Sequence, residues 1–181
     1  MPKLSKRNIL INRKTEPELF WAKIFIYYIN RFGGFDYEAK SYSTTTIDAK
    51  GKSRSGEYPE LNMQLTWVKE FEFDPNKPVT KYLHFFKENI EEAIGRKTDK
   101  YTKGKKKWDV SDIILLLQGY MSRVWANDIL TSKFCNQYKS NPFRGIYYLV
   151  RPTIDLKGKE HPKNGEVLSI KPCFNFKKIK L

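Results

Sequence analysis

The feature that most constrains this fold is a run of five consecutive aliphatic residues, Ile113 to Leu117, with no polar side chain among them. Successive side chains of a strand point to opposite faces, so a run that is apolar at every position predicts a strand covered on both sides. We therefore expect residues 112–120 to form a central strand of a sheet that has helices packed on both faces.

Three segments show the apolar periodicity of helices. Residues 16–32 follow Thr15, which we interpret as an N-cap, with Glu18 completing a capping box. This helix is expected to stop at a pair of glycines. Residues 79–96 form an amphipathic pattern, and residues 122–138 form a third helical pattern. Together they supply the helices that the central strand requires.

Strands are expected where β-branched and aromatic residues recur between turn-forming residues. These segments are residues 35–47, 57–64, 65–73, 144–150 and 166–170. Residues 57–64 and 65–73 are either two strands joined by a tight turn or one long bent strand. We interpret residues 48–56, 97–107 and 155–164 as loops, and residues 1–14 as a basic N-terminal arm with an edge strand at 9–11. The order of elements predicts a single mixed α/β domain over residues 15–181, in which a central mixed sheet is flanked by helices.

The net charge indicates the class of partner. Thirty-four Lys and Arg residues against 20 Asp and Glu residues give +14, and 40% of the chain is hydrophobic, which is too apolar for a disordered basic tail. A folded protein with this surplus attracts polyanions, most commonly nucleic acid. Two basic loops are expected to contact phosphates and stack on bases: Lys50, Lys52 and Arg54 in one, and Lys97, Lys100, Tyr101, Lys103, Lys105, Lys106 and Lys107 in the other.

Several other classes are disfavoured. No stretch approaches the roughly 18 apolar residues of a membrane-spanning helix. Residues 1–13 lack the apolar segment and cleavage site of a secretory signal, so we expect a cytoplasmic protein without membrane contact. Cys135 and Cys173 lie far apart, outside any zinc-binding spacing, and are expected to be buried thiols.

The order helix, three strands, helix, strand resembles the core of the PD-(D/E)XK nuclease superfamily. In that family an acid at the start of the second core strand, and an acid and a lysine two residues apart on the third, converge on Mg²⁺. Here Tyr58-Pro59-Glu60-Leu61 stands where the family has its proline and first acid, and Trp67-Val68-Lys69 stands where it has its second acid and lysine.

The resemblance implies a restriction-endonuclease-like core and a metal-dependent DNA endonuclease. It assigns Glu60 and the helix-borne Glu18 as ligands of Mg²⁺, for which Mn²⁺ can substitute, and Lys69 as the residue beside the scissile phosphate. For these roles the Glu60 carboxylate and the Lys69 amine must converge on one ion site. DNA is favoured over RNA as the substrate.

The sequence departs from the motif at Trp67, because indole cannot bind Mg²⁺. Either Glu57, Glu70 or Glu72 supplies the missing oxygen, or the site is degenerate and the fold is kept for binding. Replacement by Glu70 or Glu72 requires a bulge, because strand geometry places both on the face opposite Lys69. A second register also fits by count: Glu38-Ala39-Lys40 and Asp48-Ala49-Lys50 both read acid, any residue, lysine. The expectation that Asp48 lies in an exposed turn disfavours this register.

Two further functional classes stay open. One is a noncatalytic DNA- or RNA-binding protein, in which the basic loops bind the backbone and the acids are structural. The other is a basic subunit of a nucleoprotein assembly. A homodimer is also compatible with the nuclease hypothesis, since cutting both strands of a duplex needs two sites.

Overall fold

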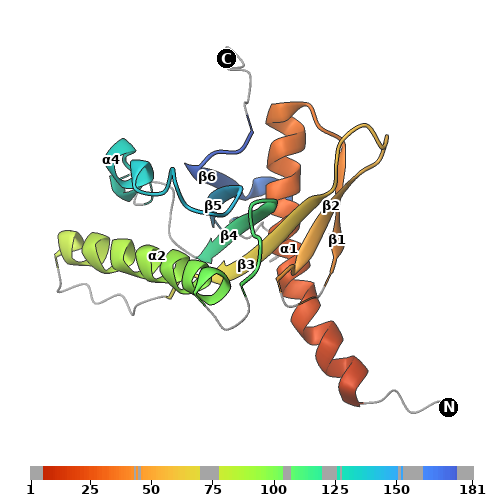
Figure 1. Cartoon of the computed structure of the whole chain (residues 1–181), viewed down its shortest axis with the longest axis horizontal. Coiled ribbons are helices and arrows are strands. Elements are labelled where there is room, and N and C mark those ends of the chain that lie inside the picture. Colours follow the sequence, from red (N-terminus) through yellow and green to blue (C-terminus); the bar gives the residue numbers. More distant parts are fainter. Residues whose placement is uncertain are drawn as a thin grey trace.

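The computed structural model describes residues 6–42, 44, 46–69, 78–103, 107–119, 126, 128–150, 152 and 161–174. The elements follow in the order α1 (Lys6–Gly33), β1 (Tyr37–Ser41), β2 (Ala49–Ser53), β3 (Leu61–Trp67), α2 (Val79–Thr102), β4 (Ile113–Gly119), α4 (Ser132–Asn136), β5 (Gly145–Val150), the 3₁₀ helix η1 (Pro162–Asn164) and β6 (Glu166–Lys171) (Figure 1).

The six strands form one mixed sheet in the order β1-β2-β3-β4-β5-β6. Strands β1, β2 and β3 form an antiparallel meander, β3, β4 and β5 are parallel, and β6 returns antiparallel to β5. Helix α2 makes the long connection that a parallel β3–β4 pair requires. The predicted mixed α/β class is confirmed.

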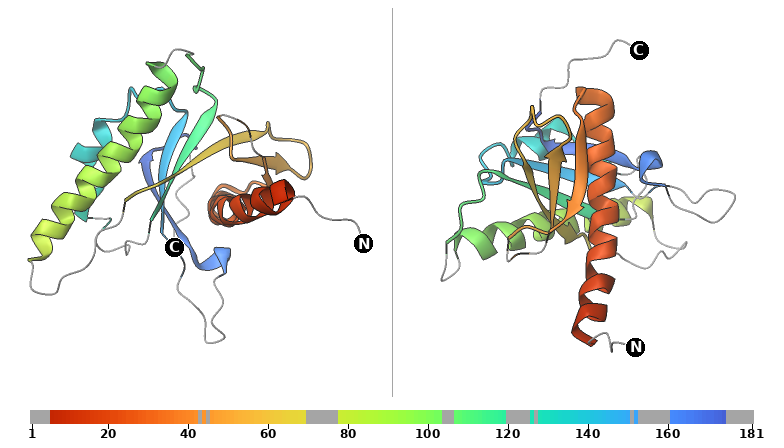
Figure 2. Two further views of the ribbon diagram at one scale, coloured as in Figure 1. Left: turned by 90° about the horizontal axis from the view of Figure 1, so that it is seen from below. Right: turned by 90° about the vertical axis from the view of Figure 1, so that its right-hand side faces the viewer.

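Helices cover both faces of the sheet. Figure 2 shows α1 on one face and α2 with α4 on the other. Strand β4 serves both layers: Ile114 and Leu116 pack with α1, whereas Ile113, Leu115 and Leu117 pack on the α2 side. All seven of its residues are buried. The prediction of a central strand covered on both sides is therefore confirmed.

Strand β3 lies beside β4 but differs on one face. Its alternate residues Leu61, Met63 and Leu65 pack in the layer of α1. The residues between them, Asn62, Gln64 and Thr66, point to the opposite face, because side chains alternate along a strand. Gln64 and Thr66 are buried there even though they are polar. Buried polar groups need hydrogen-bond partners, and those partners form the site described below.

Helix α1 is longer than predicted. It begins at Lys6, so the edge strand expected at residues 9–11 and the N-cap expected at Thr15 are wrong. It ends at Gly33 as predicted, followed by Gly34 at φ 71°. The Asn30 side chain then holds the start of β1, accepting from Tyr37 N at 2.9 Å and donating to Tyr37 O at 2.7 Å.

The first three strands differ from their predicted bounds. β1 covers only part of residues 35–47, and the expected loop at 48–56 contains β2. Residues 57–64 and 65–73 were predicted as two strands or as one long bent strand, and their described part contains the single strand β3. Strand β2 alternates small inward residues with outward lysines, so it lacks the β-branched and aromatic residues that mark strands.

Helix α2 continues past its predicted end at residue 96 to Thr102. Gly95 is exposed in the helix and a side chain there would meet nothing within 4 Å, so this glycine interrupts no packing. Beyond it, Tyr101 is fully buried in the layer between α2 and the sheet. This burial holds the last turns of the helix where a lysine-rich loop was expected.

The remaining elements follow the predictions more closely. β5 and β6 occupy the expected segments, and α4 forms part of the predicted helix 122–138, capped by the Thr131 hydroxyl. Cys135 and Cys173 are free and half-buried, and burial raises the pKa of both thiols. None of the described helices combines the length and apolarity needed to cross a bilayer.

Candidate functional site

Asp48 directly precedes β2 and its carboxylate reaches across to β3. Its backbone N–H donates to Met63 O at 2.9 Å, which sets the position of the residue. Its Oδ2 accepts from the backbone N–H of Leu65 at 2.8 Å and from the Gln64 side-chain amide. The carboxylate is thus fixed beside the polar face of β3, and the expectation that Asp48 lies in an exposed turn is wrong.

Gln64 links Asp48 to helix α2. Its Nε2 donates to Asp48, and its Oε1 accepts from the Tyr101 hydroxyl at 2.7 Å. Gln64 is 3% exposed and Tyr101 is fully buried. Burial, and then the charge of Asp48, raise the pKa of Tyr101, which keeps the phenol protonated as the donor. This chain of hydrogen bonds satisfies polar groups that would otherwise be costly to bury.

Lys97 lies one turn before Tyr101 on α2, so both side chains lie on the same side of the helix. Burial lowers the pKa of Lys97, and the neighbouring cations Lys100 and Arg96 lower it further. The carboxylates of Asp48 and Glu18 act in the opposite direction. Of the two carboxylates, Asp48 has the larger effect on the pKa of Lys97.

A second contact from α2 reaches the end of β3. Arg96 Nη2 lies 3.2 Å from Thr66 Oγ1 and 3.5 Å from Trp67 O. Thr66 is buried, whereas the arginine is exposed. The cluster of Glu18, Asp48, Gln64, Thr66, Arg96, Lys97 and Tyr101 is named the Asp48 cluster below. Hydrogen bonds link Asp48, Gln64 and Tyr101, and a further contact links Thr66 with Arg96. Lys97 and Glu18 are included because the charges of Asp48 and Glu18 both raise the pKa of Lys97.

The Asp48 cluster offers oxygen donors rather than a complete metal cage. Among the described residues, no group of three or more His, Cys, Asp or Glu side chains could hold a metal ion. Magnesium needs fewer protein ligands than other metals, because it is commonly bound by one or two carboxylates together with substrate phosphates. Asp48 and Glu18 satisfy that requirement in number.

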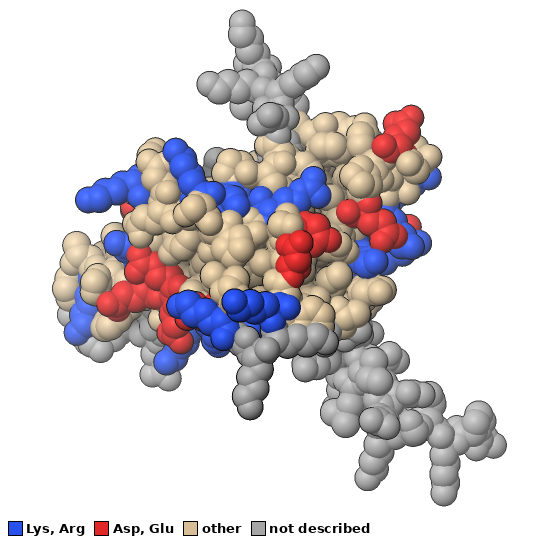
Figure 3. Space-filling model, in the orientation of Figure 1, with Lys and Arg blue, Asp and Glu red and all other residues tan. Residues whose placement is uncertain are grey.

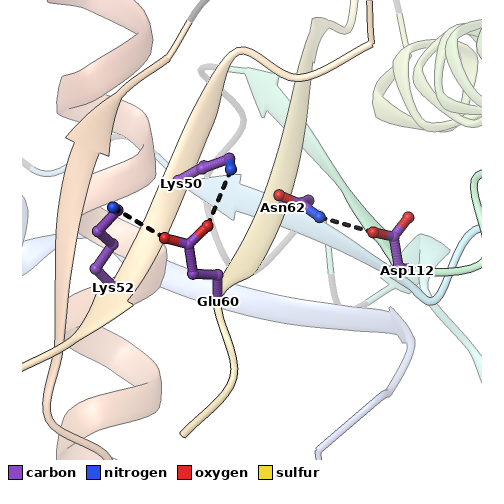
Figure 4. Close-up of polar contacts among 5 residues, drawn as sticks. All are labelled: Lys50, Lys52, Glu60, Asn62 and Asp112. Atoms are coloured by element: carbon purple, nitrogen blue, oxygen red, sulfur yellow. Dashed lines mark hydrogen bonds and ion pairs between the residues drawn. The ribbon is translucent and has the colours of Figure 1, made fainter. Parts of the chain in front are cut away.

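The predicted ligand Glu60 lies elsewhere. Its Oε2 accepts from Lys50 Nζ at 2.9 Å and its Oε1 accepts from Lys52 Nζ at 3.0 Å (Figure 4). These two contacts, the one with Lys50 first, lower the pKa of Glu60. Next to this group, Asn62 donates to Asp112 at 2.7 Å. Glu60 is therefore paired with two cations.

Glu60 and Lys69 do not converge. Glu60 directly precedes β3, whereas Lys69 lies two residues beyond its last residue, Trp67. At a rise of about 3.3 Å per residue, roughly 25–30 Å of chain separates them. The structure thus does not bring these predicted catalytic residues together. In the second register, Lys40 pairs with Glu38 at 3.5 Å, and Glu38 lies opposite Lys52, at the other end of β2 from Asp48.

Four of the predicted basic residues lie on secondary structure. Lys50 and Lys52 belong to β2, and Lys97, Lys100 and Tyr101 belong to α2. Tyr101 cannot stack on a base because it is fully buried, which corrects that prediction. Arg54 and Lys107 are exposed after β2 and α2, and Lys103 pairs with Asp99 at 2.9 Å. Lys105 and Lys106 lie outside the described residues.

The basic side chains are also divided among acidic ones. On the face drawn in Figure 3, Lys and Arg gather in several groups with Asp and Glu between them. On this face a polyanion would therefore meet local cationic sites between acidic groups. Lys97 and Arg96 form one cationic site in the structure, and Lys50 and Lys52 form another.

Sequence reasoning missed Gln64, Thr66 and Arg96 and disfavoured Asp48. The available signal was the alternation of Leu61, Met63 and Leu65 with polar residues, which predicts one apolar and one polar face. When a strand with one polar face lies next to the fully apolar β4, that polar face indicates a functional site inside the sheet rather than a solvent-exposed edge strand.

Comparisons of this chain with protein-family models, with curated proteins and with solved structures give no match.

Proposed function

We propose that this protein binds nucleic acid and cleaves its phosphodiester backbone at the Asp48 cluster with the help of Mg²⁺. The observation that carries the proposal is the Asp48 carboxylate, which the Leu65 N–H and the Gln64 amide fix at the polar face of β3, where Tyr101 of α2 also binds Gln64. Carboxylates beside a cation are what phosphodiester hydrolysis needs to hold a metal and to stabilise charge on phosphate. The net charge of +14 supports a polyanionic substrate.

The arrangement of elements supports the resemblance to PD-(D/E)XK nucleases, but with other residues at the motif positions than Glu60 and Lys69. The position at the start of the second core strand is held by Asp48, since β2 begins at Ala49. Gln64 and Thr66 lie two residues apart on β3, on the face to which Asp48 is hydrogen-bonded. The chain thus has an amide in place of the second acid and a hydroxyl in place of the lysine. Lys97 of α2 supplies the cation instead.

The donor set fits a hard divalent cation. Asp48 and Glu18 would hold it by carboxylate oxygens, and a bound ion polarises a phosphate and lowers the pKa of water. The Gln64 amide can present either its nitrogen or its oxygen to Asp48, because Tyr101 can donate or accept in return. The Lys97 ammonium is placed to stabilise negative charge on the phosphate, and Arg96 to hold the backbone.

The test is cleavage of labelled single- and double-stranded DNA and RNA with Mg²⁺ or Mn²⁺. We expect Asp48→Asn to lower the rate at least about 100-fold, because it removes the central carboxylate charge. Glu18→Gln and Lys97→Met should also lower it. Lys69→Ala is the matched control, because this exposed lysine lies beyond β3 and should cut at the wild-type rate.

Metal-dependent cutting that is equal in wild type and Asp48→Asn would overturn the proposed site. The circular dichroism spectrum and the urea midpoint of each variant separate loss of chemistry from loss of folding. DNA is expected to be cut in preference to RNA, on the basis of the family resemblance alone.

A noncatalytic nucleic-acid-binding protein is the second candidate. It is favoured by Gln64 and Thr66 standing where an acid and a lysine would complete the motif, and by the hydrogen bonds that already satisfy Gln64. Binding without cutting under all metal conditions, unchanged in Asp48→Asn, would establish this function instead.

A further inference from the structure

Glu60 and its two lysines form a compact ionic group outside the Asp48 cluster. Both carboxylate oxygens are used, one by each ammonium, at 2.9 and 3.0 Å (Figure 4). The Lys50 ammonium also lies 4.3 Å from the centre of the Tyr42 ring, on which it makes a cation–π contact. Lys50 is therefore oriented by two neighbours rather than extended freely into solvent.

The group lies on the same face of β2 as Asp48. Asp48, Lys50 and Lys52 are alternate residues, so their side chains point to one side and follow each other at about 6.6 Å. Ala49 and Gly51 point to the other side and are buried beneath α1. A nucleic acid strand that passes the Asp48 cluster can thus continue along β2 over both lysines.

We propose that Lys50 and Lys52 form a binding site for a backbone phosphate, and that Glu60 occupies this site in the free protein and is displaced when nucleic acid binds. A carboxylate and a phosphodiester both present two oxygens that share one negative charge, so the two can exchange between the same ammonium groups. The inference rests on the proposed nucleic-acid binding. It adds a second phosphate contact, at Lys50 and Lys52, and a carboxylate of the protein itself, Glu60, that competes with the phosphate.

Displacement of Glu60 requires little reorganisation. The side chain is 44% exposed and directly precedes β3, so it can rotate into solvent without disturbing a strand. Exposed ion pairs contribute little to stability, whereas a bound phosphate releases condensed counterions. Lys50, at 19% exposure, stays in place to receive the phosphate. The physical consequence is that Glu60 weakens nucleic-acid binding and makes it more readily reversible.

The test measures binding, not cleavage, so it is independent of the Asp48 chemistry. The fluorescence anisotropy of a short labelled DNA duplex is followed in EDTA over a series of salt concentrations. We expect Glu60→Gln to bind about 3- to 10-fold more tightly than wild type near 0.1 M salt. The slope of log K against log salt should stay near the wild-type value in Glu60→Gln, because the same phosphate contact forms in both proteins once Glu60 is displaced. In Lys52→Ala, which loses one of the two cations, the slope should become shallower by about 0.9.

Two further variants make the result specific. Glu57→Gln removes the same charge three residues earlier in the same exposed turn, outside the contact with the lysines, and is expected to change the affinity much less. Lys52→Ala should weaken binding. Glu60→Gln should tighten binding much less in the Lys52→Ala background than it does in the wild type. That non-additivity is the signature of a shared site.

The outcomes separate this inference from the proposed function. Equal affinities of Glu60→Gln and Glu57→Gln for the duplex would overturn the phosphate site and leave cleavage at Asp48 unaffected. Tighter binding by Glu60→Gln without metal-dependent cutting would support the phosphate site and overturn catalysis. Absence of binding in wild type and all variants would overturn both.

Discussion

Strands β3 and β4 are parallel neighbours in the centre of one sheet, yet they are built differently. Every residue of β4 is buried. Five of its seven residues are aliphatic and consecutive, so both faces of the strand are apolar over that stretch. Strand β3 presents aliphatic residues to α1 but buries Gln64 and Thr66 beneath α2. Burying amide and hydroxyl groups costs free energy unless each finds a partner. The comparison indicates that β4 stabilises the fold, whereas one face of β3 is committed to the Asp48 cluster.

Leu115→Ala, on the stabilising strand, should have the largest effect. Leu115 is fully buried in the layer between the sheet and α2, so we expect the free energy of unfolding to fall by about 2–5 kcal/mol. Urea denaturation followed by circular dichroism measures this change. Val79→Ala, at a 52%-exposed position, is the control and should change stability by no more than about 0.5 kcal/mol. A loss at Leu115 as small as at Val79 would contradict the role given to β4.

Gln64→Leu, on the polar face of β3, should cost less, about 1–3 kcal/mol. The cost arises because the Tyr101 hydroxyl and the Asp48 carboxylate each lose a hydrogen-bond partner while buried or half-buried. Urea denaturation of Gln64→Leu, Tyr101→Phe and the double variant completes a mutant cycle. The double variant should be more stable than the sum predicts by about 0.5 kcal/mol or more. Strict additivity would show that Gln64 and Tyr101 do not interact as described.

Thr66→Val should have a smaller effect, about 1 kcal/mol. The two side chains have nearly the same shape, so the change removes the hydroxyl and its contact with Arg96 while the packing stays similar. The loss is measured by urea denaturation in the wild type and again in an Arg96→Ala background. It should shrink in that background, where the contact is already absent. An equal loss in both would place the cost of Thr66→Val elsewhere.

The smallest expected effect is the pH dependence contributed by Glu60, which lies outside β3 on the exposed surface. Its pKa is lowered in the folded protein by Lys50 and then Lys52, so the folded state binds this proton less readily than the unfolded state. The ion pair therefore stabilises the fold above the usual glutamate pKa, and this contribution is lost as the pH falls through the lowered value. Urea midpoints of wild type and Glu60→Gln, from about pH 6 down to about pH 3, should converge at the acidic end. Curves that stay parallel over this range would contradict the coupling.

The parts of the fold predicted correctly are those whose sequence pattern and environment agree. Ile113 to Leu117 is apolar on both sides of the strand, and it is buried on both sides. β2 could not be predicted in this way, because its inward positions are Ala49 and Gly51. A Cβ on Gly51 would lie 2.8 Å from Ile26 Cδ1, so the close approach of α1 requires a small residue there. The result is a strand with the composition of a loop.

The candidate site could not be predicted from the sequence for a related reason. Asp48 and Gln64 are 16 residues apart, and only the pairing of β2 with β3 shows that they meet. Lys97 and Tyr101 join them from a part of α2 that the sequence indicated to be a loop after Gly95. The motif-based choice of Glu60 and Lys69 matched the spacing along the chain, but spacing gave no information on where β3 begins and ends.

The α2 connection between β3 and β4 also has a consequence for the order of folding. The β1–β3 meander pairs residues close in sequence, so Asp48 and Gln64 can meet early through short loop closures. The β3–β4 pairing joins residues about 50 positions apart and must await the docking of α2, which carries Lys97 and Tyr101. A partly folded chain would hold the acidic half of the site without its basic half, so the complete charge arrangement arises only in the native state.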